Sequence, residues 1–126
     1  MTAVIGLSPI KNIDVMKYPA FYVDTLPKTF GGMAVGPVIL ILERLRGDEG
    51  IRQHELTHVR QWFWTLGLLP LLYLIPQFKL GCEVQAYRVQ LQYYPDDRSW
   101  QFAGFIATRY GLNITQLEAH ALLIKP

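Results

Sequence analysis

Cysteine and charge are both scarce in this sequence, and each scarcity excludes a class of protein. The one cysteine, Cys82, cannot form a disulfide within the chain, which excludes a disulfide-stapled scaffold and favours a reducing compartment. The net charge of +2 is too small for the basic surface that nucleic-acid binding requires. We therefore expect a cytoplasmic protein with no nucleic-acid partner.

The sequence also lacks a long apolar run. The N-terminus has no basic segment ahead of an apolar core, so no secretory signal is expected. The most apolar stretch, residues 62–75, would rise only about 21 Å as a helix, against a hydrocarbon core of about 30 Å. Gly67 and Pro70 also interrupt it. We therefore expect no membrane span and interpret this stretch as buried or as an apolar surface that docks a protein partner.

Periodicity and capping residues predict one mainly helical α+β domain over residues 1–126. A β-branched run predicts a strand over residues 33–42, and Pro37 places this strand, or its first half, at a sheet edge. Residues 21–23 are expected to form a short strand or a packed arm. Helices are expected at residues 48–66, from about 80 to 93, from the Asp96-Asp97 cap to residue 110, and from 116 to 123, with a short one at Pro70.

The rest of the chain is organised around His54-Glu55-Leu56-Thr57-His58, which has the form H-E-x-x-H. Residues four apart share a helix face, so His54 and His58 can direct two imidazoles to one metal ion. Glu55 lies about 100° around the helix, close enough to hold a metal-bound water as a general base. This arrangement is typical of zinc-assisted hydrolysis. The alternative is that the two histidines share a polar surface by accident.

The flanking residues support a helix at this motif. Asp48 is a typical N-cap, and Gly67 is a typical stop. The side opposite the histidines is apolar and should face the core. This stripe consists of Leu56, Val59, Phe63 and Leu66.

A catalytic zinc ion usually takes three protein ligands and leaves one position open. Glu83 is the favoured third ligand, because a carboxylate in an otherwise apolar helix needs a buried partner. His120, the one remaining histidine, is the alternative ligand. If Glu83 is instead a solvated charge, we expect it to pair with Arg60 or Arg88.

The order of these features resembles the small gluzincin-type zincin metallopeptidases, including minimal gluzincins of bacteria and their phages. The resemblance covers about residues 30–94, through His54-Glu55-x-x-His58-Val-Arg-Gln-Trp and Glu83-x-x-Ala-Tyr. It implies that His54, His58 and Glu83 bind zinc and that Glu55 is the base. It also implies a zincin-like fold with a small antiparallel sheet, whose edge strand precedes the H-E-x-x-H helix and holds the substrate.

A metzincin is excluded, because Gln61 and Trp64 stand where that pattern has a glycine and a third histidine. The residue that steadies the oxyanion is not assigned by type and position alone. The candidates for that role are Tyr87, Tyr94, Arg88 and His120.

Two functions of different classes follow. The first is a zinc-dependent metallopeptidase or amide hydrolase that acts on a peptide or protein substrate, peptidoglycan cross-links included. Its edge strand would pair with an extended peptide, unless the strand over residues 33–42 belongs to the core and its glycines only form turns. The second is a zinc-stabilised binding module that docks a protein through residues 62–75. A fourth protein ligand such as His120 would favour the second function.

Overall fold

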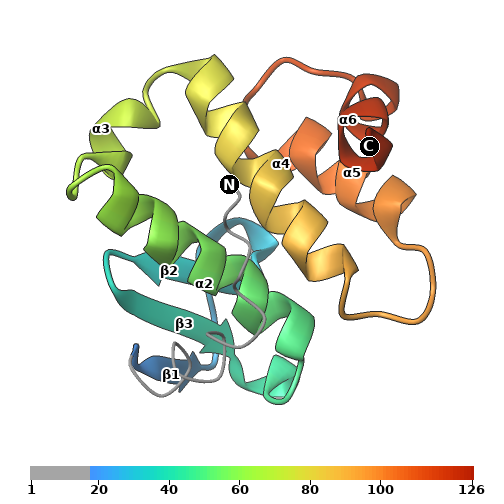
Figure 1. Cartoon of the computed structure of the whole chain (residues 1–126). Coiled ribbons are helices and arrows are strands. Elements are labelled where there is room, and N and C mark those ends of the chain that lie inside the picture. The colour runs from blue at the N-terminus through green and yellow to red at the C-terminus, as the bar shows by residue number, and fades with distance from the viewer. Residues whose placement is uncertain (1–17) are drawn as a thin grey trace.

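The fold is described for residues 18–126 of a computed structural model of the chain. This part of the chain has the expected α+β composition, with five α-helices and one three-stranded sheet (Figure 1). The strands are β1 (Ala20–Val23), β2 (Gly32–Val35) and β3 (Val38–Leu42). The helices are α2 (Glu49–Trp64), α3 (Leu69–Leu72), α4 (Pro76–Leu91), α5 (Ser99–Arg109) and α6 (Gln116–Ile124), with short 3₁₀ turns η1 (Pro27–Thr29) and η2 (Glu43–Leu45). The expectation about a secretory signal concerns residues that lie outside the described part.

The sheet is mixed, which corrects the expectation of an antiparallel one. Its strand order is β1-β3-β2, with β3 parallel to β1 and antiparallel to β2. The strand expected over residues 33–42 is two strands, because Gly36 has a φ of +59° and forms a two-residue turn with Pro37. Pro37 has no backbone N–H, and in this turn it needs no hydrogen bond to a neighbouring strand. The first half, β2, is therefore the expected edge strand, whereas β3, which directly precedes the 3₁₀ turn η2 and α2, is central.

The apolar side of α2 packs on this sheet. Leu56 and Val59 are fully buried against Ile39 and Ile41 of β3, as the predicted stripe requires. The end of the stripe is different, because Phe63 and Leu66 are 45% and 89% exposed. Leu66 is exposed because α2 ends at Trp64, before that residue.

Both ends of α2 follow the expected capping pattern. The side chain of Asp48 accepts a hydrogen bond from the backbone of Ile51 at 3.1 Å, so Asp48 is the N-cap. Gly67 has a φ of +83° and donates to the carbonyl of Trp62 at 2.8 Å, which closes the C-terminal turn. Only a glycine adopts that backbone angle without steric cost.

The second layer consists of α4, α5 and α6, which enclose a separate apolar core. This core contains Tyr87, Phe102, Ala103, Ile106, Ala119 and Leu123. Helix α4 begins four residues before the expected start, because Pro76 occupies its first turn (80 minus 76). The expected capping box is present at the start of α6, where Thr115 and Glu118 exchange hydrogen bonds. The interface between α2 and α4 therefore lies between two cores.

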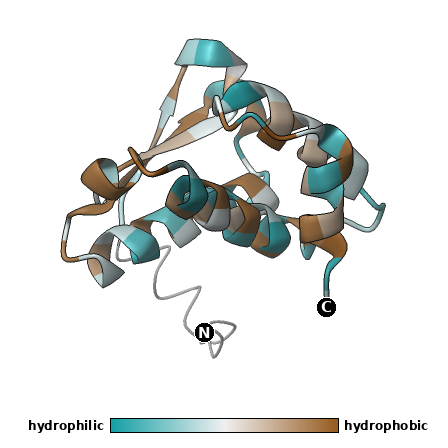
Figure 2. Cartoon of the chain, turned by 90° about the horizontal axis from the view of Figure 1, so that it is seen from above, coloured by the Kyte–Doolittle hydropathy of each residue, from teal (hydrophilic) through white to brown (hydrophobic). Residues whose placement is uncertain are grey.

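Helix α3 lies at one corner of the molecule, and Figure 2 shows hydrophobic residues concentrated on that side. Many apolar side chains there are exposed, including Trp64, Leu66, Leu68, Leu71, Leu74 and Ile75. Within residues 18–126, no helix combines the length and apolarity that crossing a membrane requires.

Candidate metal centre

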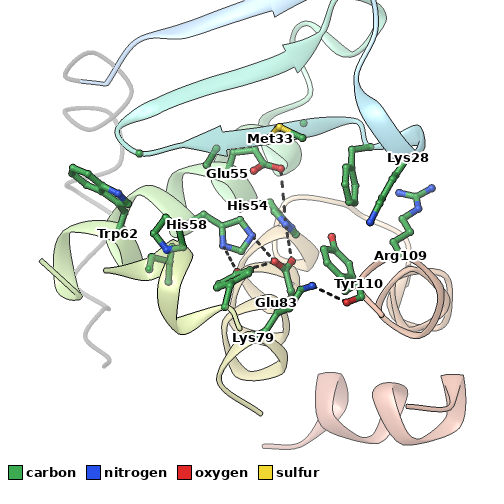
Figure 3. A pocket seen from close by; sticks show the side chains of 17 residues that line it. Lys28, Met33, His54, Glu55, His58, Trp62, Lys79, Glu83, Arg109 and Tyr110 are labelled. Atoms are coloured by element: carbon green, nitrogen blue, oxygen red, sulfur yellow. Dashed lines mark hydrogen bonds and ion pairs between the residues drawn. The ribbon is translucent and has the colours of Figure 1, made fainter. Parts of the chain in front are cut away.

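His54, His58 and Glu83 converge in the interface between α2 and α4 (Figure 3). Nε2 of His58 lies 3.2 Å from one carboxylate oxygen of Glu83, and Nε2 of His54 lies 3.6 Å from the other. The three ligand atoms all lie within 4.8 Å of one another, and all three side chains are buried. The structure thus brings together the three residues that the sequence predicts as ligands.

The two helices are antiparallel, because contacts made by successive turns of α2 occur in reverse order along α4. Gln61 near the end of α2 donates to the carbonyl of Cys82, His58 meets Glu83, and His54 meets Gln90. The histidine side of α2 is therefore covered by α4 and is not a solvated surface. An accidental pair of surface histidines is excluded by this burial.

The far ring nitrogen of each histidine is held by a glutamine. Nδ1 of His54 lies 2.9 Å from Oε1 of Gln90, and Nδ1 of His58 lies 2.8 Å from Oε1 of Gln61. An amide oxygen accepts a hydrogen bond, so each Nδ1 carries a proton and each Nε2 is the nitrogen that can ligate a metal ion. Such partners orient histidine ligands and strengthen them in many metal sites.

Gln90 is itself fixed by a hydrogen-bonded chain that reaches the start of α2. Its Nε2 donates to the hydroxyl of Tyr94 at 2.9 Å, and this hydroxyl donates to Asp48 at 2.7 Å. Gln90 is not predicted by the motif or by the composition of its helix. Its spacing is the one indication, because it lies about two helical turns beyond Glu83 and therefore on the same face of α4.

Replacing Gln90 by leucine should weaken zinc binding by about 10- to 100-fold, because the imidazole of His54 loses the acceptor that fixes its tautomer. Competition with a colorimetric zinc chelator measures this affinity. Gln92→Leu is the matched control, since Gln92 is exposed just after α4. Equal zinc affinities for the two variants would contradict the orienting role of Gln90.

Tyr73 is a further residue of the site that the sequence does not predict. It follows α3, and its hydroxyl donates to a Glu83 oxygen at 2.8 Å and lies 3.3 Å from Nδ1 of His58. Burial and the charge of Glu83 raise the pKa of Tyr73, so it remains a neutral donor. Its location in an apolar stretch gave no indication of this role.

One buried oxygen in this cluster has no hydrogen-bond partner among the described residues. It is Oε1 of Glu83, the atom that faces Nε2 of His54. Burial alone would raise the pKa of Glu83, but the two histidines outweigh it and lower that pKa, so the carboxylate is ionised. An unpartnered buried carboxylate oxygen is costly unless a cation satisfies it. The donor set therefore fits a divalent metal ion.

His58 and Glu83 form an ion pair when no metal is bound. Burial opposes the charge on His58, but Glu83 outweighs this and raises the pKa of His58 to about 9. A metal ion would take the place of that proton, because a ligating imidazole must be neutral. The alternative in which Glu83 is solvated and pairs with Arg60 or Arg88 does not agree with its burial.

Glu55 lies beside the three residues without belonging to their group. Its Oε2 is 4.0 Å from Nε2 of His54, and its side chain is buried. Burial raises the pKa of Glu55. The nearby His54 and His58 oppose this shift, and the charge of Glu83 adds to it. A carboxylate with a raised pKa is a better proton acceptor near neutral pH. The backbone of β2 passes close by, since a Cβ added at Gly32 would lie 3.0 Å from Glu55.

The cluster opens into a cavity of about 350 Å³ whose walls include β2. Gly32, Met33 and Ala34 of β2 line it, and a second cavity of about 270 Å³ adjoins the same site. Both cavities are lined by His54 and Glu55. The predicted base therefore lies where two hollows meet beside an edge strand.

The four candidates for the oxyanion role differ in their contacts and in their exposure. The ring of Tyr87 packs edge-on against that of His54, with the ring centroids 4.3 Å apart. The hydroxyl of Tyr87 forms a hydrogen bond with the hydroxyl of Tyr110. Tyr94 holds Gln90, and Arg88 is exposed. His120, the alternative third ligand, lies on α6 with Nε2 3.1 Å from Oγ of Ser99, and is not part of the metal-ligand group.

Comparison with known proteins adds no relative to this description. No protein-family model, curated protein or solved structure matches the chain. The function is therefore argued from the residues of the site.

Proposed function

We propose that this protein is a zinc-dependent hydrolase of peptide or amide bonds, of the gluzincin type. The observation that carries this proposal is the buried Oε1 of Glu83, which has no hydrogen-bond partner among the described residues. It lies beside Nε2 of His54, and Nε2 of His58 lies beside the other carboxylate oxygen. Two imidazole nitrogens and one carboxylate are a common ligand set of catalytic zinc, and three ligands leave a position open for substrate.

Zinc bound there would supply an acidic water and polarise the carbonyl that the water attacks. Glu55 then takes a proton from the attacking water and delivers it to the departing amine. Tyr73 keeps the Glu83 carboxylate in place, and the two glutamines keep the imidazoles in place. The two glutamates, the two histidines and the two glutamines are buried, and Tyr73 is partly buried. This burial limits competition from water for their hydrogen bonds.

The edge strand supports a peptide as substrate. One side of β2 pairs with β3, and residues of β2 line the cavity beside Glu55. An extended chain can add to such an edge through backbone hydrogen bonds, which recognise a peptide without selecting its side chains. The carbonyl of that chain would then pass next to the base.

Metal content and hydrolysis test this function together. The purified chain, loaded with zinc and dialysed, should hold about one zinc ion per molecule by elemental analysis. It should cleave members of a quenched fluorescent peptide library. Treatment with 1,10-phenanthroline should stop cleavage, and added zinc should restore it. Failure to bind supplied zinc, or cleavage that survives removal of the metal, would overturn the proposal.

A zinc-stabilised binding module is the second candidate function. The exposed apolar side chains around α3 favour it, because a contiguous apolar patch commonly marks a docking surface for a protein. This function predicts that zinc raises the melting temperature without any hydrolysis, and that a fourth protein ligand closes the site. His120 does not supply that ligand in this structure, since it contacts Ser99. The hydrolase is therefore the better-supported function.

A further inference from the structure

Two basic side chains from distant parts of the chain meet at one end of the cavity. Lys28 belongs to η1, and Arg109 is the last residue of α5. Both line the cavity that contains Glu55 and Glu83, and Figure 3 shows them on the same side of it, next to Tyr110. Neither is a member of the metal-ligand group.

A second hollow beside this pair has no carboxylate among its described wall residues. Lys28 and Arg109 also line an adjoining hollow whose other wall residues are Phe105, Thr108 and Gly111. The guanidinium of Arg109 lies over the ring of Phe105 at 3.8 Å, a contact that leaves the edges of the guanidinium for hydrogen bonding. Two cations on one wall attract an anion that lies between them.

A third cation lies at this end of the cavity. Lys79 lines the first cavity and donates to the carbonyl of Tyr110 at 2.7 Å, which holds its ammonium group at this end. Among residues 18–126, the carboxylates that line the cavity are Glu55 and Glu83, and the proposed function uses both. When Glu83 binds the metal and Glu55 holds the water, the charged side chains that remain on the wall are positive.

We propose that Lys28 and Arg109 bind a carboxylate of the substrate, so that the enzyme selects peptides with a negative charge near the bond it cleaves. The inference rests on the proposed function for its catalytic part. Guanidinium and ammonium groups together form charge-assisted hydrogen bonds with a carboxylate. Lys28 also has a φ of +56°, a left-handed conformation that is rare for a lysine and that occurs here at the cavity wall.

The first test needs neither zinc nor turnover. The metal-free protein is titrated with glutarate while the Nε–Hε signal of Arg109 is followed by NMR, and glutaramide is the neutral probe. Glutarate should produce a saturable shift, glutaramide should not, and Lys28→Gln should weaken glutarate binding at least about tenfold. Lys125→Gln removes the same charge at an exposed site that lines none of the three cavities, and should bind glutarate like the wild type. A wild-type protein that shows no saturable shift with glutarate overturns the proposal.

The second test uses the zinc-loaded protein and matched peptides. One pair differs by glutamate or glutamine inside an amidated peptide, and another differs by a free or amidated C-terminus. The carboxylate member of one pair should have a kcat/KM higher by at least about tenfold. Arg109→Gln should abolish this preference, whereas Arg109→Lys should keep part of it.

The two pairs identify the source of the carboxylate. A preference in the first pair assigns the pocket to an acidic side chain, and a preference in the second assigns it to the chain terminus. Equal rates within both pairs overturn the substrate preference. A glutarate shift in a protein that cleaves nothing leaves the anion site in place and rejects the hydrolase, so the two failures are distinguishable.

Discussion

Replacing Glu55 by glutamine is expected to lower the turnover of peptide substrates by about a thousandfold, within the range that a general base contributes. Zinc content should stay at the wild-type value, because the metal-ligand group consists of His54, His58 and Glu83. Glutamine has nearly the same shape as glutamate, so it fits beside Gly32, where space is tight. A loss of turnover in this variant would therefore reflect proton transfer and not a change in packing.

The burial of Glu55 sharpens this prediction. A buried carboxylate with a raised pKa costs folding energy, so its neutral replacement should leave the melting temperature unchanged or slightly raise it. Glu43→Gln is the matched control, since Glu43 is an exposed residue that pairs with Arg46. Steady-state kinetics and elemental analysis are carried out on the same preparations. Full activity in Glu55→Gln would reject the hydrolytic mechanism.

Local sequence rules predicted the elements that carry this site. The spacing of His54 and His58 requires only a helix, and Asp48 begins that helix as a typical N-cap. Glu83 was identified because a carboxylate in an apolar helix needs a buried partner, and the structure places it beside both histidines. In each case one residue and its near neighbours in the chain contain the information.

The parts that were not predicted depend on contacts between distant segments. The sheet is mixed because β3 lies between β1 and β2, and no local pattern specifies which strands become neighbours. The polar side of α2 is buried because α4 covers it, which also determines the roles of Gln90 and Tyr73. Lys28 and Arg109 meet only after η1 and the end of α5 are placed at the same cavity.

Replacing Glu83 by glutamine is the second change with a large expected effect. It should reduce zinc affinity at least about a hundredfold, because the site loses its one anionic ligand and keeps two neutral imidazoles. Elemental analysis after dialysis against a weak chelator should find zinc in the wild type and little in the variant. The control is again Glu43→Gln, which removes the same charge from the surface.

The metal-free forms of these proteins separate a metal site from a buried ion pair. Without zinc, Glu83 pairs with protonated His58, so Glu83→Gln should destabilise the metal-free fold as well, by about 3 kcal/mol or less, because His58 can lose its proton. Zinc should then raise the melting temperature of the wild type and leave that of the variant almost unchanged. If both bind zinc equally, the third ligand is another residue and the gluzincin resemblance fails. If neither binds zinc, the two histidines and Glu83 are a buried ionic cluster that joins α2 to α4, and the orphaned carboxylate oxygen needs an explanation other than a metal.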